Sequence, residues 1–291
     1  MARETESSFE GAGGIRLHAQ CWAPEGNARA VVALVHGISE HCRRYETLVG
    51  HLTGVGFAVC SFDHRGHGKS PGKRGHINDW SEYREDVRAF LEHVRKTVPT
   101  RRLFLYGHSL GALIVAEYNL HHWHGIAGLI VSGIPLRPTG AAKPHMVFMA
   151  KMLSRIWPTL TLPLDVDGSK LSRDAAIARA YETDPMVHHK ASTQWGAEAL
   201  RAIDRVRERA ADIRLPILIL HGESDLVNDV EGSKELFEKV SSADKEIVIY
   251  PGGAHEPHND LDREKVARDV EDWMTRHLHA SKPVASSESA R

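Results

Sequence analysis

One short segment constrains the fold of this chain more than any other stretch. An apolar run at residues 103–106 leads into Gly-His-Ser-Leu-Gly, and a helix-forming run follows at residues 112–118. A strand, a sharp turn and a helix in this order hold a serine in a strained backbone conformation, which requires small residues at Gly107 and Gly111. The pattern predicts that Ser109 is a nucleophile exposed at the edge of a β-sheet, above the first amides of a helix.

Apolar runs of strand length alternate with amphipathic helical patterns along most of the chain. This alternation predicts an α/β fold with a mostly parallel central sheet and helices on both faces. Strands are expected at residues 7–10, 14–22, 30–35, 57–62, 103–106, 129–132, 217–220 and 246–250. Helices are expected at residues 44–55, 80–97, 109–122, 193–211, 233–240 and 262–279.

A serine nucleophile needs a base that is oriented by an acid. The expected strand at 217–220 runs into a loop that contains Asp225, and the strand at 246–250 runs into a loop that contains His255. Open α/β sheets collect their chemistry at the carboxyl ends of the strands. Ser109, Asp225 and His255 are therefore the expected catalytic triad.

Nearby residues compete for two of these roles. Glu223 is a rival for the acid, but it follows its strand too closely, whereas Asp225 has the reach. His258 is a rival for the base, but His255 comes first after the Gly-Gly turn. The His121-His122-Trp-His124 cluster has no cysteine or carboxylate at metal-ligand spacing, so a solvated helix end is expected there. The chemistry requires no metal and no organic cofactor.

A second oxyanion donor is expected from the loop after the strand at 30–35. That loop begins His36-Gly37-Ile38, and its glycine lets the backbone approach a substrate. The amides of Ile38 and Leu110 are the expected oxyanion donors. As an alternative, His36-Gly37 is simply where the chain leaves the strand, which would leave the oxyanion hole half built.

Residues 133–216 are too many for one crossover between parallel strands. We expect core residues 1–135 and 193–279, an inserted cap at 136–192 and a disordered, Ser/Ala-rich tail at 280–291. Apolar side chains gather in the first half of the cap, where they either seal it against the core or line an apolar tunnel and face lipid. These residues are Met146, Val147, Phe148, Met149, Met152, Leu153, Ile156, Trp157, Leu160, Leu162 and Leu164.

Composition narrows the possible partners and locations. The 291-residue chain has a net charge of −1, and it contains no basic run that would favour nucleic-acid binding. Neither a secretory signal nor an apolar run of membrane-spanning length is evident. Cys21 and Cys60 are expected to be small core residues, and Cys42 lies near the expected site, so no disulfide framework is predicted. A reducing, cytoplasmic location is the resulting expectation.

The chain resembles the monoacylglycerol lipases, within the lysophospholipase-like and serine-aminopeptidase-like α/β-hydrolases. The matching motifs cover nearly the whole chain, roughly residues 14–278. They are HGISEHCRRY at 36–45, the DHRGHGKS turn at 63–70, GHSLG at 107–111, HGESD at 221–225 and HEPHN at 255–259. The turn at 63–70 is expected to be a structural brace. Two departures are Ala112, where many relatives have glycine, and Ile38, which is bulkier than usual and leaves the preferred acyl-chain length open.

The resemblance implies an α/β-hydrolase fold with an inserted helical cap, and hydrolysis of a monoacylglycerol through an acyl-enzyme. It also implies that Glu40, Arg44 and His108 surround the alcohol end of the substrate. An equally favoured alternative is that they fix the oxyanion loop through a buried ion pair. The implied partner is a small acyl ester, with peripheral lipid contact through the cap left open and the oligomeric state unknown.

Other functions stay open at this stage. A lysophospholipase or a general carboxylesterase fits the same motifs, because fold analogy does not identify a substrate. A prolyl aminopeptidase-like enzyme would need acidic cap residues to hold a substrate amino terminus, and candidates exist. A non-catalytic binding module is disfavoured, since all the triad positions are filled. The acidic cap candidates are Asp165, Asp167, Asp174, Glu182 and Asp184.

Overall fold

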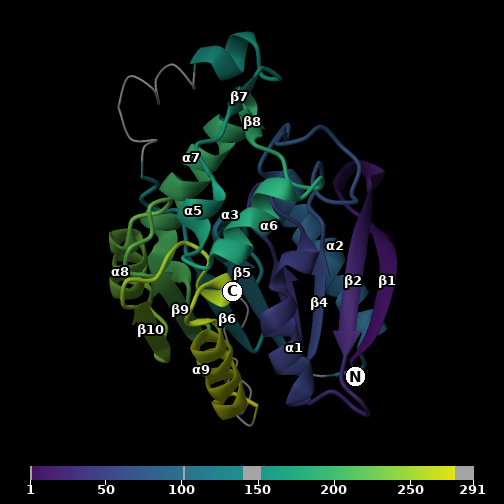
Figure 1. Cartoon of the computed structure of the whole chain (residues 1–291). Coiled ribbons are helices and arrows are strands. Elements are labelled where there is room, and N and C mark those ends of the chain that lie inside the picture. The colour runs from purple at the N-terminus through teal and green to yellow at the C-terminus, as the bar shows by residue number, and fades with distance from the viewer. Residues whose placement is uncertain (1, 101, 140–151, 279–291) are drawn as a thin grey trace, which may run out of the picture.

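A sheet of eight strands runs through the molecule, in the order β1-β2-β4-β3-β5-β6-β9-β10 (Figure 1). The computed structural model describes residues 2–100, 102–139 and 152–278. β1 and β2 pair antiparallel, β2 pairs antiparallel with β4, and the other neighbours are parallel. The strands are β1 (Arg3–Glu10), β2 (Arg16–Ala23), β3 (Val31–Val35), β4 (Ala58–Phe62), β5 (Leu103–His108), β6 (Gly128–Ser132), β9 (Ile217–Gly222) and β10 (Lys245–Tyr250).

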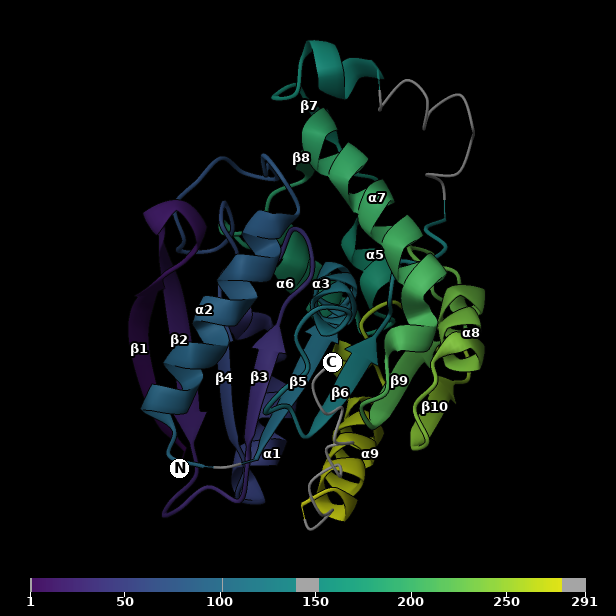
Figure 2. The same cartoon turned by 180° about the vertical axis from the view of Figure 1, so that it is seen from behind.

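Helices cover both faces of this sheet, as the front and back views show (Figures 1 and 2). One face carries α1 (Glu46–Gly54) and α9 (Arg263–Arg276), and the other carries α2 (Ser81–Thr97), α3 (Leu110–Asn119), α7 (Thr193–Arg209) and α8 (Val230–Lys239). The central strands β3 to β6 and β9 are buried along their whole length. Strands with two covered faces read as continuous apolar runs, which is why the sequence reveals them.

Two apolar clusters hold these layers together. One joins the sheet to α2, α3, α7 and α8 through side chains such as Phe90 and Leu113, and the other joins it to α1 and α9 through Leu52 and Trp273. The prediction of an α/β-hydrolase fold with a mostly parallel sheet is confirmed. A helix expected from residue 233 begins three residues earlier, because the Asp229 carboxylate accepts a hydrogen bond from the Glu231 amide and caps it.

Short elements fill the insertion between β6 and α7. They are β7 (Thr161–Pro163), α5 (Gly168–Leu171), α6 (Ala175–Thr183) and β8 (Lys190–Ser192), with a further helical stretch at residues 152–156. β7 and β8 form a two-stranded sheet above the carboxyl edge of the main sheet (Figure 1). The cap boundaries 136 and 192 stay predictions. Met146, Val147, Phe148 and Met149 lie outside the described residues, as does the tail at 280–291.

The cysteine prediction was wrong in one respect. Cys21 and Cys60 form a disulfide between β2 and β4, where they are directly paired in the antiparallel register. Both are buried, as expected of core residues, and Cys42 is a free, buried thiol. The prediction of a reducing, cytoplasmic location rested on free cysteine thiols. The disulfide removes that argument. Within the described ranges, no helix combines the length and apolar character needed to cross a membrane.

Candidate active site

The turn between β5 and α3 holds Ser109 in the conformation that the sequence predicts. Its backbone has φ 52° and ψ −119°, a left-handed region that residues other than glycine rarely adopt. The surrounding backbone leaves no room for a side chain at Gly111, where a Cβ atom would overlap the Val35 carbonyl oxygen. β5 and α3 hold this strained turn in place from its two sides. The Ser109 hydroxyl is therefore held above the sheet edge.

A continuous chain of polar contacts connects Ser109, His255 and Asp225. The Ser109 Oγ lies 2.9 Å from His255 Nε2, and His255 Nδ1 lies 2.7 Å from Asp225 Oδ2. The second oxygen of Asp225 accepts hydrogen bonds from the Val227 and Asn228 amides. The carboxylate is therefore fixed from both sides, and it orients the imidazole toward the serine.

The rivals for these positions lie elsewhere. Glu223 accepts a hydrogen bond from the Gly252 amide and does not reach His255. His258 stacks on Tyr45 with ring centroids 4.4 Å apart, and burial lowers its pKa to about 4. Of the two candidate histidines, His255 is the one beside the serine.

Electrostatics favour an ionised acid next to a basic imidazole. Burial by itself would raise the pKa of Asp225, but the His255 charge and a hydrogen bond from His221 hold this pKa well below its ordinary value. Burial lowers the pKa of His255, yet the Asp225 carboxylate more than compensates, so the net shift is upward. His255 is thereby poised to accept a proton from the serine near neutral pH.

The loop after β3 approaches Ser109 from the other side. Ile38 lines the same pocket as Ser109 and His255, and Leu110 is the first residue of α3, so its amide has no acceptor within the helix. The Gly37 amide donates to Glu40 Oε1, which also accepts a hydrogen bond from the Tyr45 hydroxyl at 2.8 Å. Glu40 therefore fixes the loop that carries Ile38.

A buried ion cluster continues behind this loop. Arg44 donates to both carboxylate oxygens of Glu256, at 3.0 and 2.8 Å, and its Nε lies 3.6 Å from Glu40 Oε2. Burial and the nearby Glu256 raise the pKa of Glu40 to about 7. Burial also opposes ionisation of Glu256, but Arg44 holds the pKa of Glu256 below its ordinary value. One arginine thus braces two loops of the site.

Some polar atoms of this cluster remain available to a ligand. Among the described residues, no hydrogen-bond partner is present for the Tyr181 hydroxyl, and Glu40 Oε2 and Arg44 Nε have only their ion pair with each other. Glu40 and Tyr181 line the pocket, and so does His108, whose pKa burial holds well below its ordinary value. Buried polar atoms are costly to leave unpaired. The pocket therefore has one end that is suited to hydroxyl groups.

The cavity above Ser109 is small. Its volume is about 20 Å³, whereas ligand pockets commonly have roughly 300–1,000 Å³. Its apolar wall comes from Ile38, Val166, Leu171 and Val227, and none of the described residues at 152–164 takes part. The expected tunnel wall from the cap run therefore does not appear among them. A larger groove of about 520 Å³ lies along α7, lined by Asp204, Arg207, Glu208, Ala211 and Lys239.

Polar contacts hold the α5–α6 segment over the site. The Glu256 amide donates to the Leu171 carbonyl at 2.8 Å, and Arg173 pairs with Asp260 at 2.8 Å. Tyr181 is buried with its ring against the Arg44 guanidinium, 4.8 Å away. Leu171 and Tyr181 of this segment line the pocket together with Ser109.

The five acidic cap residues all have other partners. Asp165 and Asp167 pair with Lys170, and Asp174 pairs with Arg263. Glu182 accepts a hydrogen bond from the Gly168 amide, and Asp184 contacts His41. None of these carboxylates lines the pocket. The feature that a prolyl aminopeptidase-like site would require is therefore absent from the described part of this cap.

Sequence reasoning missed two polar pocket residues, Tyr181 and Glu256. Glu256 follows His255 directly and belongs to the HEPHN motif, so its position was a usable signal. Tyr181 carries no such signal, because only the packing of α6 brings it over Arg44.

These features define an α/β-hydrolase with a serine, a histidine and an aspartate at the carboxyl edge of its sheet. A family described as "Serine aminopeptidase, S33" matches residues 26–262, and the chain belongs to this hydrolase family.

The individual relatives are named as lipases, in contrast to the aminopeptidase description of the family. The chain is 35% identical to a monoacylglycerol lipase of Mycolicibacterium smegmatis, over 94% of this chain and 98% of the relative. It is 31% identical to the human monoglyceride lipase, over 91% of this chain and 88% of the relative. The crystal structure of Paleococcus ferrophilus monoacylglycerol lipase superposes with a TM-score of 0.82 at 35% identity, covering 90% of this chain and 99% of that one.

Proposed function

We propose that this protein hydrolyses carboxylic esters, with monoacylglycerol as its substrate, through a Ser109–His255–Asp225 triad. The contact chain from Ser109 through His255 to Asp225, beneath a pocket with one polar end, carries this proposal. The relatives named monoacylglycerol lipase and monoglyceride lipase support the substrate class.

The reaction proceeds in two steps. His255 accepts the Ser109 proton as the oxygen attacks the ester carbonyl, and Asp225 stabilises the imidazolium that forms. The amides of Ile38 and Leu110 receive the oxyanion, glycerol leaves with the proton from His255, and an acyl-enzyme remains. Water then attacks the acyl group, with His255 again as the base, and releases the fatty acid.

The polar end of the pocket binds the glycerol hydroxyls in this proposal. Glu40 Oε2 accepts a hydrogen bond from a glycerol hydroxyl, and the Tyr181 hydroxyl donates one, so both atoms gain a hydrogen-bond partner. His108 lines the same region. In this proposal Glu40 has both roles that the sequence left open, since its other oxygen braces the loop, whereas Arg44 does not line the pocket and braces the loops through Glu256.

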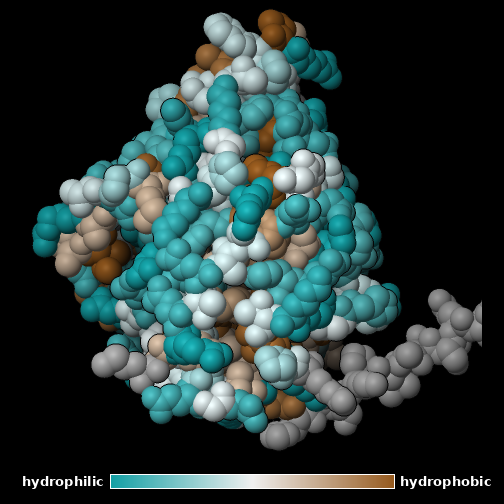
Figure 3. Space-filling view, turned by 90° about the vertical axis from the view of Figure 1, so that its right-hand side faces the viewer, coloured by the Kyte–Doolittle hydropathy of each residue, from teal (hydrophilic) through white to brown (hydrophobic). Residues whose placement is uncertain are grey.

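The acyl chain arrives from a lipid phase, and the tip of the cap contacts that phase. Four large apolar side chains of the cap are exposed, among them Ile156 with 75% of its surface accessible. Figure 3 shows hydrophobic side chains at the tip of the molecule, above a mostly hydrophilic flank. Such a patch favours contact with a lipid surface near the access route. The four residues are Met152, Ile156, Trp157 and Leu162.

A substrate panel tests the proposed specificity. The wild-type protein is assayed on 1-monoacylglycerol, diacylglycerol, a lysophospholipid, nitrophenyl esters from C2 to C16 and a proline arylamide. We expect monoacylglycerol to have the highest kcat/KM, because only it offers two free hydroxyls to the polar end. A preference for short nitrophenyl esters would indicate a general carboxylesterase, and cleavage of the arylamide would revive the peptidase alternative.

A further inference from the structure

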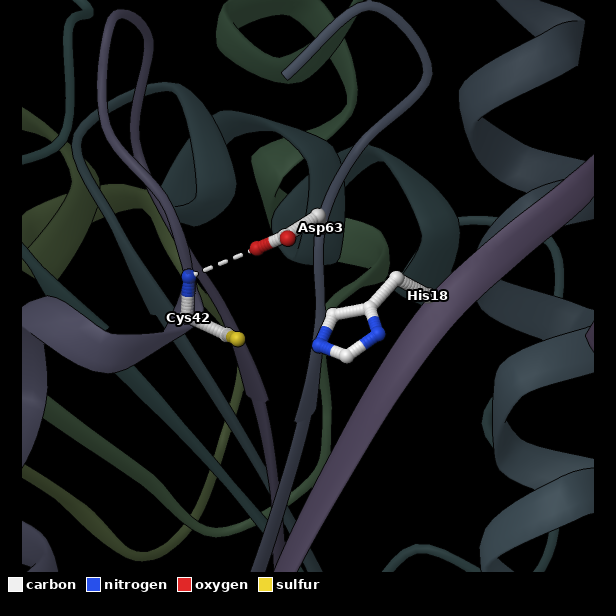
Figure 4. Close-up of side chains that lie close together, drawn as sticks. All are labelled: His18, Cys42 and Asp63. Carbon is white, nitrogen blue, oxygen red and sulfur yellow. Dashed lines mark hydrogen bonds between the residues drawn. The ribbon is translucent and has the colours of Figure 1, made fainter. Parts of the chain in front are cut away.

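Three potential metal ligands of different chemistry meet on the far side of the loop that carries Ile38. They are His18 from β2, Cys42 directly after His41, and Asp63 directly after β4. The imidazole nitrogen, the thiol sulfur and a carboxylate oxygen all lie within 4.8 Å of one another. Figure 4 shows the His18 ring and the Cys42 sulfur turned toward each other, with Asp63 above them. None of these residues lines the pocket of Ser109.

Each of the three groups has ligand capacity left. The His18 Nε2 atom is buried and has no hydrogen-bond partner among the described residues. Asp63 accepts one backbone hydrogen bond at each oxygen, from the Cys42 amide at 2.9 Å and the Lys69 amide at 2.8 Å. A carboxylate oxygen has two lone pairs, so each retains one. The same hydrogen bonds fix Asp63 and Cys42 relative to each other.

The Cys42 thiol lies beside Asp63 and Gln20. Cys42 Sγ donates to Gln20 Oε1 over 3.8 Å, and Cys42 is outside the disulfide. A cation between the sulfur and His18 Nε2 would satisfy both atoms. Gln20 Oε1 lies beside the thiol and offers an oxygen as a fourth ligand.

We propose that His18, Cys42 and Asp63 form a structural site for a borderline-soft divalent cation, best matched by Zn²⁺. Nitrogen, sulfur and oxygen donors together favour Zn²⁺, whereas Mg²⁺ and Ca²⁺ prefer oxygen alone. Bond lengths near 2.0–2.3 Å place tetrahedral ligands roughly 3.3–3.8 Å apart, so the distances between ligand atoms shorten by up to about 1.5 Å from the 4.8 Å limit. Binding replaces the Cys42 thiol proton, which leaves to solvent.

The surroundings tolerate added positive charge. Arg43 and Lys69 are the nearby cations, but Arg43 pairs with Glu4 at 2.9 Å and Lys69 pairs with Glu6 at 2.8 Å. Both carboxylates belong to β1, and each offsets the charge of its partner. His18 is only half-buried, whereas Cys42 and Asp63 are buried.

A cation at this position would join three segments that meet next to the oxyanion loop. Cys42 follows the HGISEH segment, and β2 and the turn after β4 are neighbours in the sheet. Binding to the folded state alone raises the unfolding temperature. The site would therefore act on stability and on the position of the loop, separately from the triad.

Metal titration of the purified protein tests this inference. Co²⁺ serves as the spectroscopic probe, and we expect one ion per chain with a thiolate-to-cobalt charge-transfer band that Zn²⁺ abolishes. Zn²⁺ should also raise the unfolding temperature. The variants Cys42→Ser and His18→Gln should each weaken binding by at least about a hundredfold, since loss of a ligand exceeds the 10–100-fold effect of outer-shell partners.

A control separates this site from adventitious binding to the many histidines of the chain. His122→Ala combined with His124→Ala removes two exposed histidines, and it should change neither the band nor the thermal shift. Absence of the charge-transfer band in the wild-type protein would overturn the proposal, as would an unchanged band in Cys42→Ser. If Cys42→Ser does not fold, an unchanged band in His18→Gln has the same consequence.

Discussion

The carboxyl edge of the core and the cap above it are built in different ways. At the edge, Ser109, Asp225 and His255 lie in turns and loops that follow the parallel strands β5, β9 and β10, and hydrogen bonds join the three side chains. The cap consists of short elements with exposed apolar side chains, held over the site by contacts such as Arg173–Asp260. We infer that the edge carries the chemistry and that the cap above it governs access and substrate choice.

The largest effect should follow from breaking the contact chain at the edge. Asp225→Asn is expected to lower kcat for ester hydrolysis by roughly 10⁴-fold, because the amide orients His255 wrongly and leaves its charge uncompensated. Glu223→Gln is the matched control: it changes the neighbouring carboxylate, which caps the Gly252 amide and does not contact His255, and should retain near-normal turnover. Comparable losses in both variants would remove the distinction between the two acids.

The dependence of activity on pH tests whether Asp225 controls the pKa of His255. Catalysis needs neutral His255, and Asp225 raises its net pKa above the ordinary value of 6.5 despite burial. Activity is therefore present above that raised pKa and falls about tenfold per pH unit below it. Measurement of kcat/KM between pH 5 and 9 should place the acidic midpoint above 6.5. A midpoint below 6.5 would mean that burial dominates over Asp225.

A smaller effect is expected where the cap meets the polar end of the pocket. Tyr181→Phe removes one hydroxyl without disturbing the ring over Arg44. Loss of one hydrogen bond to a substrate hydroxyl is worth about 0.5–1.5 kcal/mol, so kcat/KM for monoacylglycerol should fall roughly 2–13-fold. Turnover of a nitrophenyl ester, which has no glycerol, is the internal control. Equal losses on both substrates would give Tyr181 a general structural role.

The smallest effect concerns the exposed cap patch. Trp157→Ala should weaken binding to phosphatidylcholine vesicles a few-fold, measured by co-sedimentation, and leave hydrolysis of a soluble short ester unchanged. Trp123→Ala is the matched control, because Trp123 is also exposed but lies after α3, outside the cap. Identical vesicle binding by both variants and the wild type would argue against lipid contact at this patch.

The core could be predicted from the sequence because its signals are local. Parallel strands of this sheet read as apolar runs, and their carboxyl ends share one edge, so Ser109, Asp225 and His255 could be placed together without a structure. Expected strands and helices all appear, with ends shifted by a few residues. The helix before β10 begins at Val230 because of the Asp229 cap, which its apolar pattern does not reveal.

Contacts between distant segments could not be predicted in the same way. The Cys21–Cys60 disulfide depends on β2 and β4 being neighbours, although β3 lies between them in the sequence. The position of Tyr181 depends on how α6 packs over Arg44, and cap elements this short have weak patterns. His18, Cys42 and Asp63 likewise come together only through sheet order, without ligand spacing in the sequence.

Covalent labelling tests the central assignment most directly. The protein is treated with a fluorophosphonate, digested and mapped by mass spectrometry, with Ser109→Ala and an excess of monoacylglycerol as parallel samples. We expect a single adduct on Ser109, slower labelling when monoacylglycerol competes, and none in Ser109→Ala, whose unfolding temperature should match that of the wild type. An adduct on another serine, or undiminished labelling of Ser109→Ala, would contradict the proposed nucleophile.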